Sequence, residues 1–164
     1  LFDYLVHKKD IKREEFSTLE NFEKNMITMT ELQLSQLFLS HTKIVKINEW
    51  FSSDLTNFSP ITIHSFSWSE KPVLIDGHTR AFVAAQNGIQ ALPFILEEDV
   101  ISDDLENLYH QCVEWCQVAQ LHEILDLSTK IISQAEYEDC WIGRCETFLA
   151  KQDKLPKPIS DPTI

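Results

Sequence analysis

The stretch over residues 58–98 constrains the fold more than any other part of this chain. Three consecutive apolar residues, Val73–Ile75, run directly into Asp76 and Gly77, and an alanine-rich stretch follows as far as Asn87. A continuous apolar run is typical of a strand that is covered on both faces, and alanine favours a helix. The sequence therefore predicts a strand, a tight turn and a helix in direct succession.

Two further strands are expected beside this unit. Residues 61–66 alternate between apolar and polar side chains, which predicts a strand, and the polar turn at 69–72 predicts a hairpin into the strand that follows. Gly88 fits the left-handed residue just past a helix end, and residues 92–96 are another short strand. We expect an α/β (α+β) fold, with a small mixed sheet and a central helix over 78–87.

Helices are expected in much of the remaining chain, because apolar residues recur there three and four positions apart. They are predicted at 10–26, at 41–52, from Ser102 to Ala119, at 122–127, and from Ser133, where Ser133–Glu136 fits a capping box. Thr30 with Gln33 fits a weaker capping box. The apolar residues at 32–39 follow neither the helical repeat nor the alternation of a strand, so this stretch is ambiguous. We expect one compact domain with an N-terminal helical segment at 1–29, a core at 30–100, a C-terminal helical subdomain at 101–152 and a loose tail at 153–164.

The charge balance argues against a nucleic-acid-binding groove, although His7–Arg13 could form a local basic patch. Twenty-six acidic residues against 14 basic ones give a net charge of −12, whereas a nucleic-acid interface needs a basic surface. No apolar run approaches the roughly 20 residues of a membrane span, and the start of the chain lacks the basic region of a signal peptide. We therefore predict a soluble, cytoplasmic protein without nucleic-acid or membrane partners, and the oligomeric state stays open.

The four cysteines, Cys112, Cys116, Cys140 and Cys145, do not have the Cys-x-x-Cys spacing of common zinc sites. We expect them to be buried thiols that behave as small hydrophobic side chains in a reducing compartment. A zinc site is the weaker alternative, and no metal ligand is assigned.

The turn Asp76–Arg80 is predicted to bind a small anion. A helix that begins directly after a strand aims free backbone N–H groups at one point, and its dipole adds partial positive charge there. Gly77 would let a phosphate or carboxylate approach the backbone. Thr79 can donate a hydrogen bond, and Arg80 can clamp an oxyanion with two parallel hydrogen bonds. We assign nucleotide or phosphate binding to Gly77, His78, Thr79 and Arg80.

Two residues of this turn are candidates for catalysis. Asp76 could act as a base, hold a substrate hydroxyl or bind magnesium, and His78 could transfer a proton. The alternative is an ordinary structural turn, in which Asp76 caps the helix, Arg80 pairs with a surface acid and His78 is solvated.

The order of motifs resembles the ParB/sulfiredoxin-like superfamily. The matching segments are Pro60–Ile63, Val73–Ala81, Ala84–Ile89 and Leu92–Leu96. They correspond to a strand, a Gly-x-x-Arg helix start, an alanine-rich helix that ends in glycine, and a "val-pro-val" type strand. Members of this superfamily bind nucleotide phosphates at the turn. The resemblance implies that Gly77 and Arg80 hold phosphates, with His78 and Thr79 beside them and Asp76 as the catalytic or hydroxyl-binding acid.

Departures from the superfamily narrow the expected activity. Sulfiredoxins need a nucleophilic cysteine where this chain has His78, and ParB partition proteins have a DNA-reading helix-turn-helix where residues 101–150 are acidic. A branch of free-serine kinases has a similar Asp-Gly-His-His-Arg turn, but Leu34–Leu37 lacks the acid that those kinases have upstream. The segments Cys112–Cys116 and Trp141–Cys145 look like those of uncharacterised bacterial ParB-like proteins.

These features lead to two hypotheses. The first is a nucleotide- or phosphate-binding protein that uses ATP, ADP or CTP with Mg²⁺, as a phosphotransferase or nucleotidase acting on a small metabolite. The second is a non-catalytic ligand- or protein-binding module of ParB-like fold.

Overall fold

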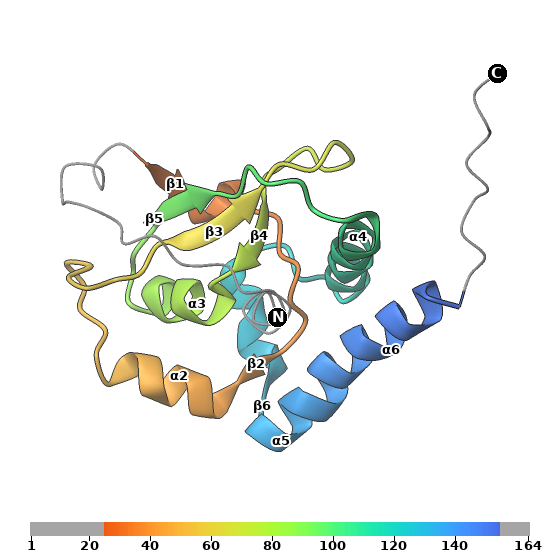
Figure 1. The fold of residues 1–164 in the computed structure, drawn as a ribbon. Helices are drawn as coiled ribbons and strands as arrows, with labels where there is room; N and C mark the ends of the chain where they lie inside the picture. The colour runs from red at the N-terminus through yellow and green to blue at the C-terminus, as the bar shows by residue number, and fades with distance from the viewer. Residues whose placement is uncertain (1–24, 155–164) are drawn as a thin grey trace.

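The computed structural model of this chain describes residues 25–154 (Figure 1). The helix predicted at 10–26 therefore lies almost entirely outside the described residues. Most of the predicted N-terminal segment at 1–29 and most of the predicted tail at 153–164 also lie outside them. Met26, the last residue of that predicted helix, instead begins the first strand, β1 (Met26–Thr28).

A four-stranded mixed sheet forms the centre of the fold, in the order β1-β5-β3-β4. β5 (Ala91–Leu96) pairs antiparallel with β1 and parallel with β3 (Ile61–His64). β4 (Val73–Asp76) pairs antiparallel with β3 across the predicted hairpin. The α/β class with a small mixed sheet is thus confirmed, although β3 ends two residues earlier than predicted.

The central helix α3 (His78–Gln86) begins one residue after β4, as predicted. Its buried apolar residues, Ala81–Ala84, belong to the same hydrophobic cluster as Ile61 and Leu74 of the sheet. Gly88 has a φ of +79°, and its amide donates to the carbonyl of Ala85. The glycine thus ends the helix in the predicted left-handed conformation.

The segment between β1 and the next helix is an irregular, largely buried stretch. A short 3₁₀ turn, η2 (Met29–Glu31), is closed by a capping box between Thr28 and Glu31, so the pairing predicted for Thr30 and Gln33 is wrong. Gln33 bridges to Val73 in a parallel sense, which covers the outer edge of β4.

Two short strands and a helix follow this stretch. β2 (Leu39–Ser40) pairs parallel with β6 (Ile131–Ile132), and α2 (His41–Asn48) begins at Ser40, whose hydroxyl caps it. α2 ends four residues earlier than predicted, in a turn at 49–50, and the loop that follows has positive φ at Leu55 and Asn57.

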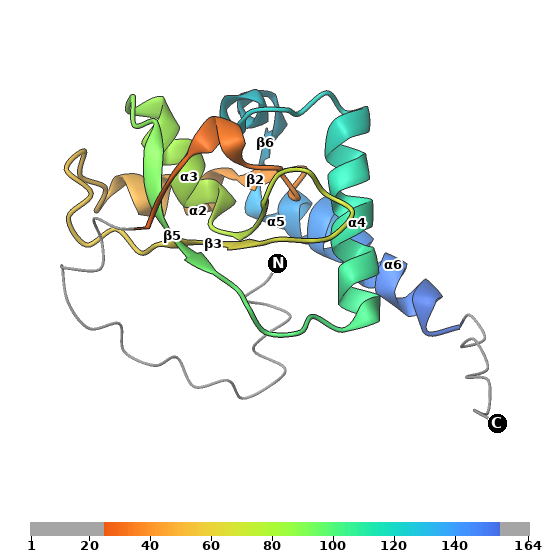
Figure 2. The same cartoon turned by 90° about the horizontal axis from the view of Figure 1, so that it is seen from above.

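The C-terminal part is helical, as expected. Its elements are α4 (Asp103–Val118), η3 (Ile124–Lys130), α5 (Gln134–Tyr137), the π-helical η4 (Glu138–Ile142) and α6 (Gly143–Gln152). The Ser133–Glu136 capping box is present, with the Glu136 amide 3.2 Å from Ser133 Oγ. The short helix predicted at 122–127 is a 3₁₀ helix that lies slightly later. Figure 2 shows α4 on the opposite side of the molecule from α2 and α3.

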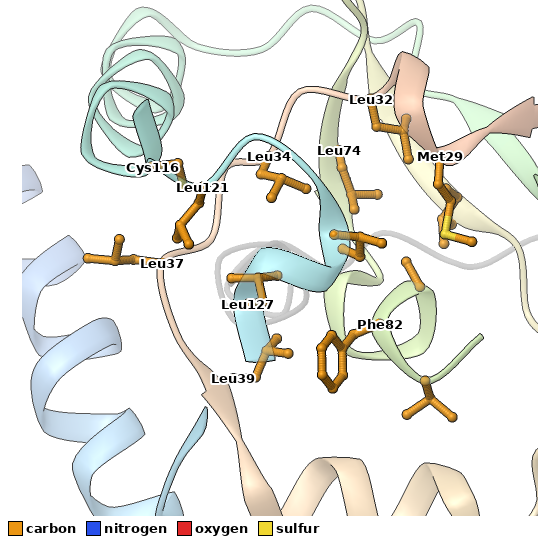
Figure 3. Packing of buried hydrophobic residues seen from close by; sticks show 14 of the residues in the cluster. Met29, Leu32, Leu34, Leu37, Leu39, Leu74, Phe82, Cys116, Leu121 and Leu127 are labelled. Carbon is orange, nitrogen blue, oxygen red and sulfur yellow. The ribbon is translucent and has the colours of Figure 1, made fainter. Parts of the chain in front are cut away.

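The main hydrophobic cluster joins the sheet, α3, the irregular stretch and the C-terminal helices (Figure 3). Three cysteines, Cys112, Cys116 and Cys145, are buried in it as predicted, whereas Cys140 is exposed and corrects that prediction. Among residues 25–154, no helix combines the length and apolar character needed to cross a membrane. Within the same range, no three His, Cys, Asp or Glu side chains are grouped so as to hold a metal ion.

Candidate functional site

Gly77 links β4 to α3 and has a φ of +104°. A Cβ at this position would lie 2.8 Å from Cγ2 of Ile61 and 3.0 Å from an Nη atom of Arg80. The backbone conformation and the internal packing therefore both require glycine. The space beside its Cα, which the sequence predicts to be open to a phosphate or carboxylate, is instead filled by Ile61 and Arg80. Gly77 is also the N-cap of α3, and no side chain caps this helix, so the sequence alternative in which Asp76 caps it is not observed.

Arg80 lies one turn into α3 and reaches back over the turn. Its Nη2 donates to the carbonyl of Pro60 at 3.2 Å and to Oδ2 of Asp76 at 3.2 Å. The two charged side chains are largely buried, with 20% of Arg80 and 16% of Asp76 exposed. The buried Nε of Arg80 has no hydrogen-bond partner among the described residues. The guanidinium is thus held in place on one side and has an unused donor on another.

Asp76 owes its orientation to an irregularity in β4. Thr62 lies opposite Asp76 and Ile63 lies opposite Leu74, which leaves Ile75 as an extra residue in β4. Directly opposed residues of an antiparallel pair project from the same face of the sheet. In a regular strand Leu74 and Asp76 would share a face. The bulge instead places Asp76 on the face of Thr62, a re-aiming that is typical of bulges at functional sites.

α4 packs against the hairpin near the loop that joins β3 to β4. Tyr109 and Val113 form a buried cluster with Val73, Ile75 and Phe66. Tyr109 is 1% exposed, and its hydroxyl has no partner among the described residues. Burial raises the pKa of Tyr109 well above its ordinary value, and the nearby Cys112 and Asp76 add to the increase.

His78 is 3% exposed, and its Nε2 accepts a hydrogen bond from the backbone N–H of Ser35 at 3.1 Å. Burial lowers the pKa of His78 to about 3. The ring is therefore uncharged at neutral pH, and the lone pair of Nε2 is already used. This geometry makes His78 a structural acceptor, and it does not support the proton-shuttle role expected from the sequence.

The structure thus brings together part of the predicted site. Asp76, Gly77 and Arg80 are in mutual contact, Thr79 is partly exposed beside them, and the side chain of His78 points into the interior. By its spacing, Tyr109 falls on the apolar stripe of the helix predicted from Ser102 to Ala119, and nothing in the sequence connects it to Asp76.

Two cavities lie away from this turn. One of about 390 Å³ is lined by residues of the β3–β4 loop and α4, including Trp68 and His110. The other, of about 450 Å³, is lined by residues of η2, the end of α3 and η3, including Met29 and Leu125. Neither of these two cavities is lined by Asp76–Arg80.

The fold and site together define an α/β protein in which an arginine-bearing turn joins a bulged edge strand to a helix. Comparison with models of protein families, with curated proteins and with solved structures found no match to this chain.

Proposed function

We propose that this protein binds a small phosphate-bearing ligand, a nucleotide such as ATP, ADP or CTP, at the start of α3. The observation that carries the proposal is the placement of Arg80. The carbonyl of Pro60 and the carboxylate of Asp76 fix its guanidinium beside a helix start that no side chain caps, and the buried Nε remains without a partner. The resemblance of the turn to the ParB/sulfiredoxin-like superfamily points to the same ligand class.

Several contributions favour a phosphate at this position. The first amides of α3 have no intrahelical acceptors, and the helix dipole places about half a positive charge there. A phosphate can accept from these amides and from Arg80 together, in charge-assisted hydrogen bonds that are stronger than neutral ones. Thr79 is partly exposed and supplies a hydroxyl donor. The phosphate has to compete with Asp76 for Arg80, because the ion pair occupies Nη2.

The narrower form of the proposal is phosphoryl transfer to, or hydrolysis of, a small metabolite. Asp76 is the carboxylate of the turn, and its chemistry fits a magnesium ion held by one carboxylate together with nucleotide phosphates. Bound magnesium would neutralise charge that develops on the phosphoryl oxygens. Asp76 would bind that ion or accept a proton from a substrate hydroxyl. His78 takes no part, because it is buried and uncharged.

A non-catalytic ligand- or protein-binding module is the second candidate. The Asp76–Arg80 ion pair favours it, because each charge already has a partner and neither side chain is free to act as a general base or a phosphate clamp without breaking that pair. If the protein is such a module, the turn binds an anion without catalysing a reaction, or it only stabilises the fold.

Thermal denaturation with ATP, ADP and CTP, each with and without Mg²⁺, tests the binding proposal. A nucleotide at 100 times its Kd should stabilise the folded protein by about 2.7 kcal/mol through mass action. Arg80→Gln should abolish the shift, whereas Lys151→Gln, which removes one positive charge from an exposed position on α6, should retain it. The proposal is wrong if no nucleotide raises the melting temperature of the wild type, or if Arg80→Gln keeps the full shift.

Phosphate release from the bound nucleotide separates the two candidates. If the protein is an enzyme, Asp76→Asn should lose turnover, while Asp139→Asn, an exposed acid in η4, should keep it. Binding without turnover in the wild type, or equal rates in wild type and Asp76→Asn, would favour the second candidate.

A further inference from the structure

Three buried side-chain donors lack a hydrogen-bond partner among residues 25–154: Arg80 Nε, Tyr109 Oη and Trp141 Nε1. Buried polar atoms in folded proteins are nearly always hydrogen-bonded, so each exception needs an explanation. Trp141 meets the ring of Trp115 edge to face at 6.1 Å, and a ring face can accept a weak N–H hydrogen bond. Tyr109 also has an aromatic neighbour, Phe66, but those two rings are tilted by only 37° and do not meet edge to face. Tyr109 and Arg80 remain.

Both donors are linked to the carboxylate of Asp76, whose charge also contributes to the raised pKa of Tyr109. Arg80 bonds directly to Asp76. Tyr109 packs on Val73 and Ile75, the residues of β4 that lead to Asp76. Val73 lies opposite His64, and Asp76 lies opposite Thr62, two positions away on the same strand. Val73 and Asp76 therefore project from one face of the sheet, which is the face that Tyr109 covers.

We propose that Tyr109 forms the second half of the ligand site, and that its hydroxyl donates to an oxygen of the ligand other than those of the phosphate. This inference rests on the proposed function. Arg80 and the first amides of α3 hold the phosphate, Asp76 accepts from a ligand hydroxyl, and Tyr109 donates to a second oxygen. The site therefore takes a hydroxylated phosphate ester, such as the ribose phosphate part of a nucleotide, in preference to inorganic phosphate.

The unpartnered hydroxyl of Tyr109 should lower the stability of the unliganded protein. A buried polar group without a partner is destabilising, and its replacement by an apolar group of the same shape is close to neutral or stabilising. Tyr109→Phe should therefore raise the melting temperature of the unliganded protein and also weaken ligand binding. A purely structural tyrosine would not produce both effects, and stability given up at a binding site in this way is a common trade-off.

The experiment compares wild type, Tyr109→Phe and Tyr137→Phe, with Arg80→Gln as the reference for phosphate binding. The probes are inorganic phosphate and whichever of ATP, ADP and CTP stabilises the wild type most. We expect Tyr109→Phe to melt about 2–4 °C higher than wild type without ligand. It should bind the nucleotide about tenfold more weakly, since a donor to a charged or polar ligand group is lost. Its affinity for inorganic phosphate should be unchanged.

Tyr137→Phe is the matched control, because it makes the same chemical change at another buried tyrosine, 2% exposed. Its hydroxyl is not among the unpartnered atoms, so it should neither raise the melting temperature nor weaken nucleotide binding. If Arg80→Gln abolishes nucleotide binding while Tyr109→Phe binds it as wild type does, the inference about Tyr109 is overturned and the proposed function stands. If wild type binds none of the probes, the proposed function itself fails.

A spectroscopic measurement covers the case in which Tyr109→Phe does not fold. The chain has three tyrosines, so selective ¹³Cζ labelling gives few signals. We expect nucleotide to move one tyrosine ζ-carbon resonance that survives in Tyr137→Phe, and inorganic phosphate to leave it in place. Unmoved tyrosine resonances at saturating nucleotide would contradict the inference.

Discussion

The imidazole Nε2 of His78 accepts a hydrogen bond from the backbone N–H of Ser35 at 3.1 Å, across 43 positions of the sequence. Ser35 in turn donates its hydroxyl to the carbonyl of Leu74. The two contacts tie the irregular stretch after η2 to both sides of the turn, to the end of β4 and to the start of α3. His78 therefore contributes to the shape of the candidate site through its neutral form.

This contact predicts a loss of stability in acid. The pKa of His78 is about 3 in the folded protein because of burial, against an ordinary value of 6.5. The folding stability that depends on neutral His78 is fully present above pH 6.5. It is lost as the pH falls toward 3, because the unfolded chain binds the proton at a higher pH than the folded protein does. Each unit of pKa difference corresponds to about 1.4 kcal/mol, so several kcal/mol depend on this residue.

Urea unfolding of wild type and His78→Gln between pH 7 and pH 4 measures the effect. Glutamine keeps a hydrogen-bond acceptor but does not titrate. The free energy of unfolding of His78→Gln should therefore fall less steeply than that of wild type as the pH is lowered. His110→Gln, an exposed histidine of α4, should follow the wild-type curve. Parallel curves for wild type and His78→Gln would show that the His78 pKa is not lowered.

Three glycine-to-alanine substitutions separate backbone strain from steric overlap. Gly77→Ala combines a φ of +104° with a Cβ 2.8 Å from Ile61, and it should cost roughly 2–4 kcal/mol. Gly88→Ala has a φ of +79° but open space, and it should cost about 1–2 kcal/mol. Gly143→Ala involves neither a positive φ nor a steric overlap, and residue 143 lies at the start of α6. This substitution should therefore stabilise the folded protein by about 0.5–1 kcal/mol. Chemical denaturation gives the three values, and any other order contradicts the packing described for Gly77.

The Asp76–Arg80 ion pair predicts that Asp76 competes with a bound anion. Asp76→Asn removes the competing charge, so inorganic phosphate should bind about fivefold more tightly in the absence of Mg²⁺, from a pair contribution of about 1 kcal/mol. Isothermal titration calorimetry of wild type, Asp76→Asn and Asp139→Asn measures this change. Weaker binding in Asp76→Asn alone would mean that Asp76 acts by supporting Arg80 and not by competing for it.

Two N-cap serines in the C-terminal region provide a paired test of helix capping. Ser133 Oγ accepts from the Glu136 amide, and Ser133→Ala should cost about 1 kcal/mol. Ser102 is the N-cap of α4 but makes no side-chain capping bond, so Ser102→Ala should cost less. Equal free-energy losses in urea unfolding would contradict the difference between the two caps.

Features set by neighbouring residues could be predicted from the sequence. The strand, turn and helix around Asp76, the stop at Gly88 and the capping box at Ser133 each depend on a few adjacent side chains. The role of His78 could not be predicted, because its acceptor function depends on Ser35, which lies on a separate segment. The function expected from the sequence, including a phosphate ligand at the turn, stays a prediction.

The orientation of Asp76 shows why register limits such predictions. The apolar run from Val73 to Ile75 predicts a strand, but strict alternation would have placed Asp76 on the face of Leu74. The extra residue becomes visible only once Thr62 and Ile63 are paired with β4. The sequence also does not link Tyr109 to β4, because its neighbours in the fold, β4 and Phe66, lie more than 30 positions earlier in the chain.

The contact between Gly77 and Ile61 also limits how much the turn could change on binding the proposed ligand. Ile61 is completely buried at the start of β3 and fills the position that a side chain on residue 77 would need. The backbone amides of the turn are therefore already ordered in the unliganded protein. A pre-organised site loses little conformational entropy on association, so the proposed ligand would need few contacts to bind there.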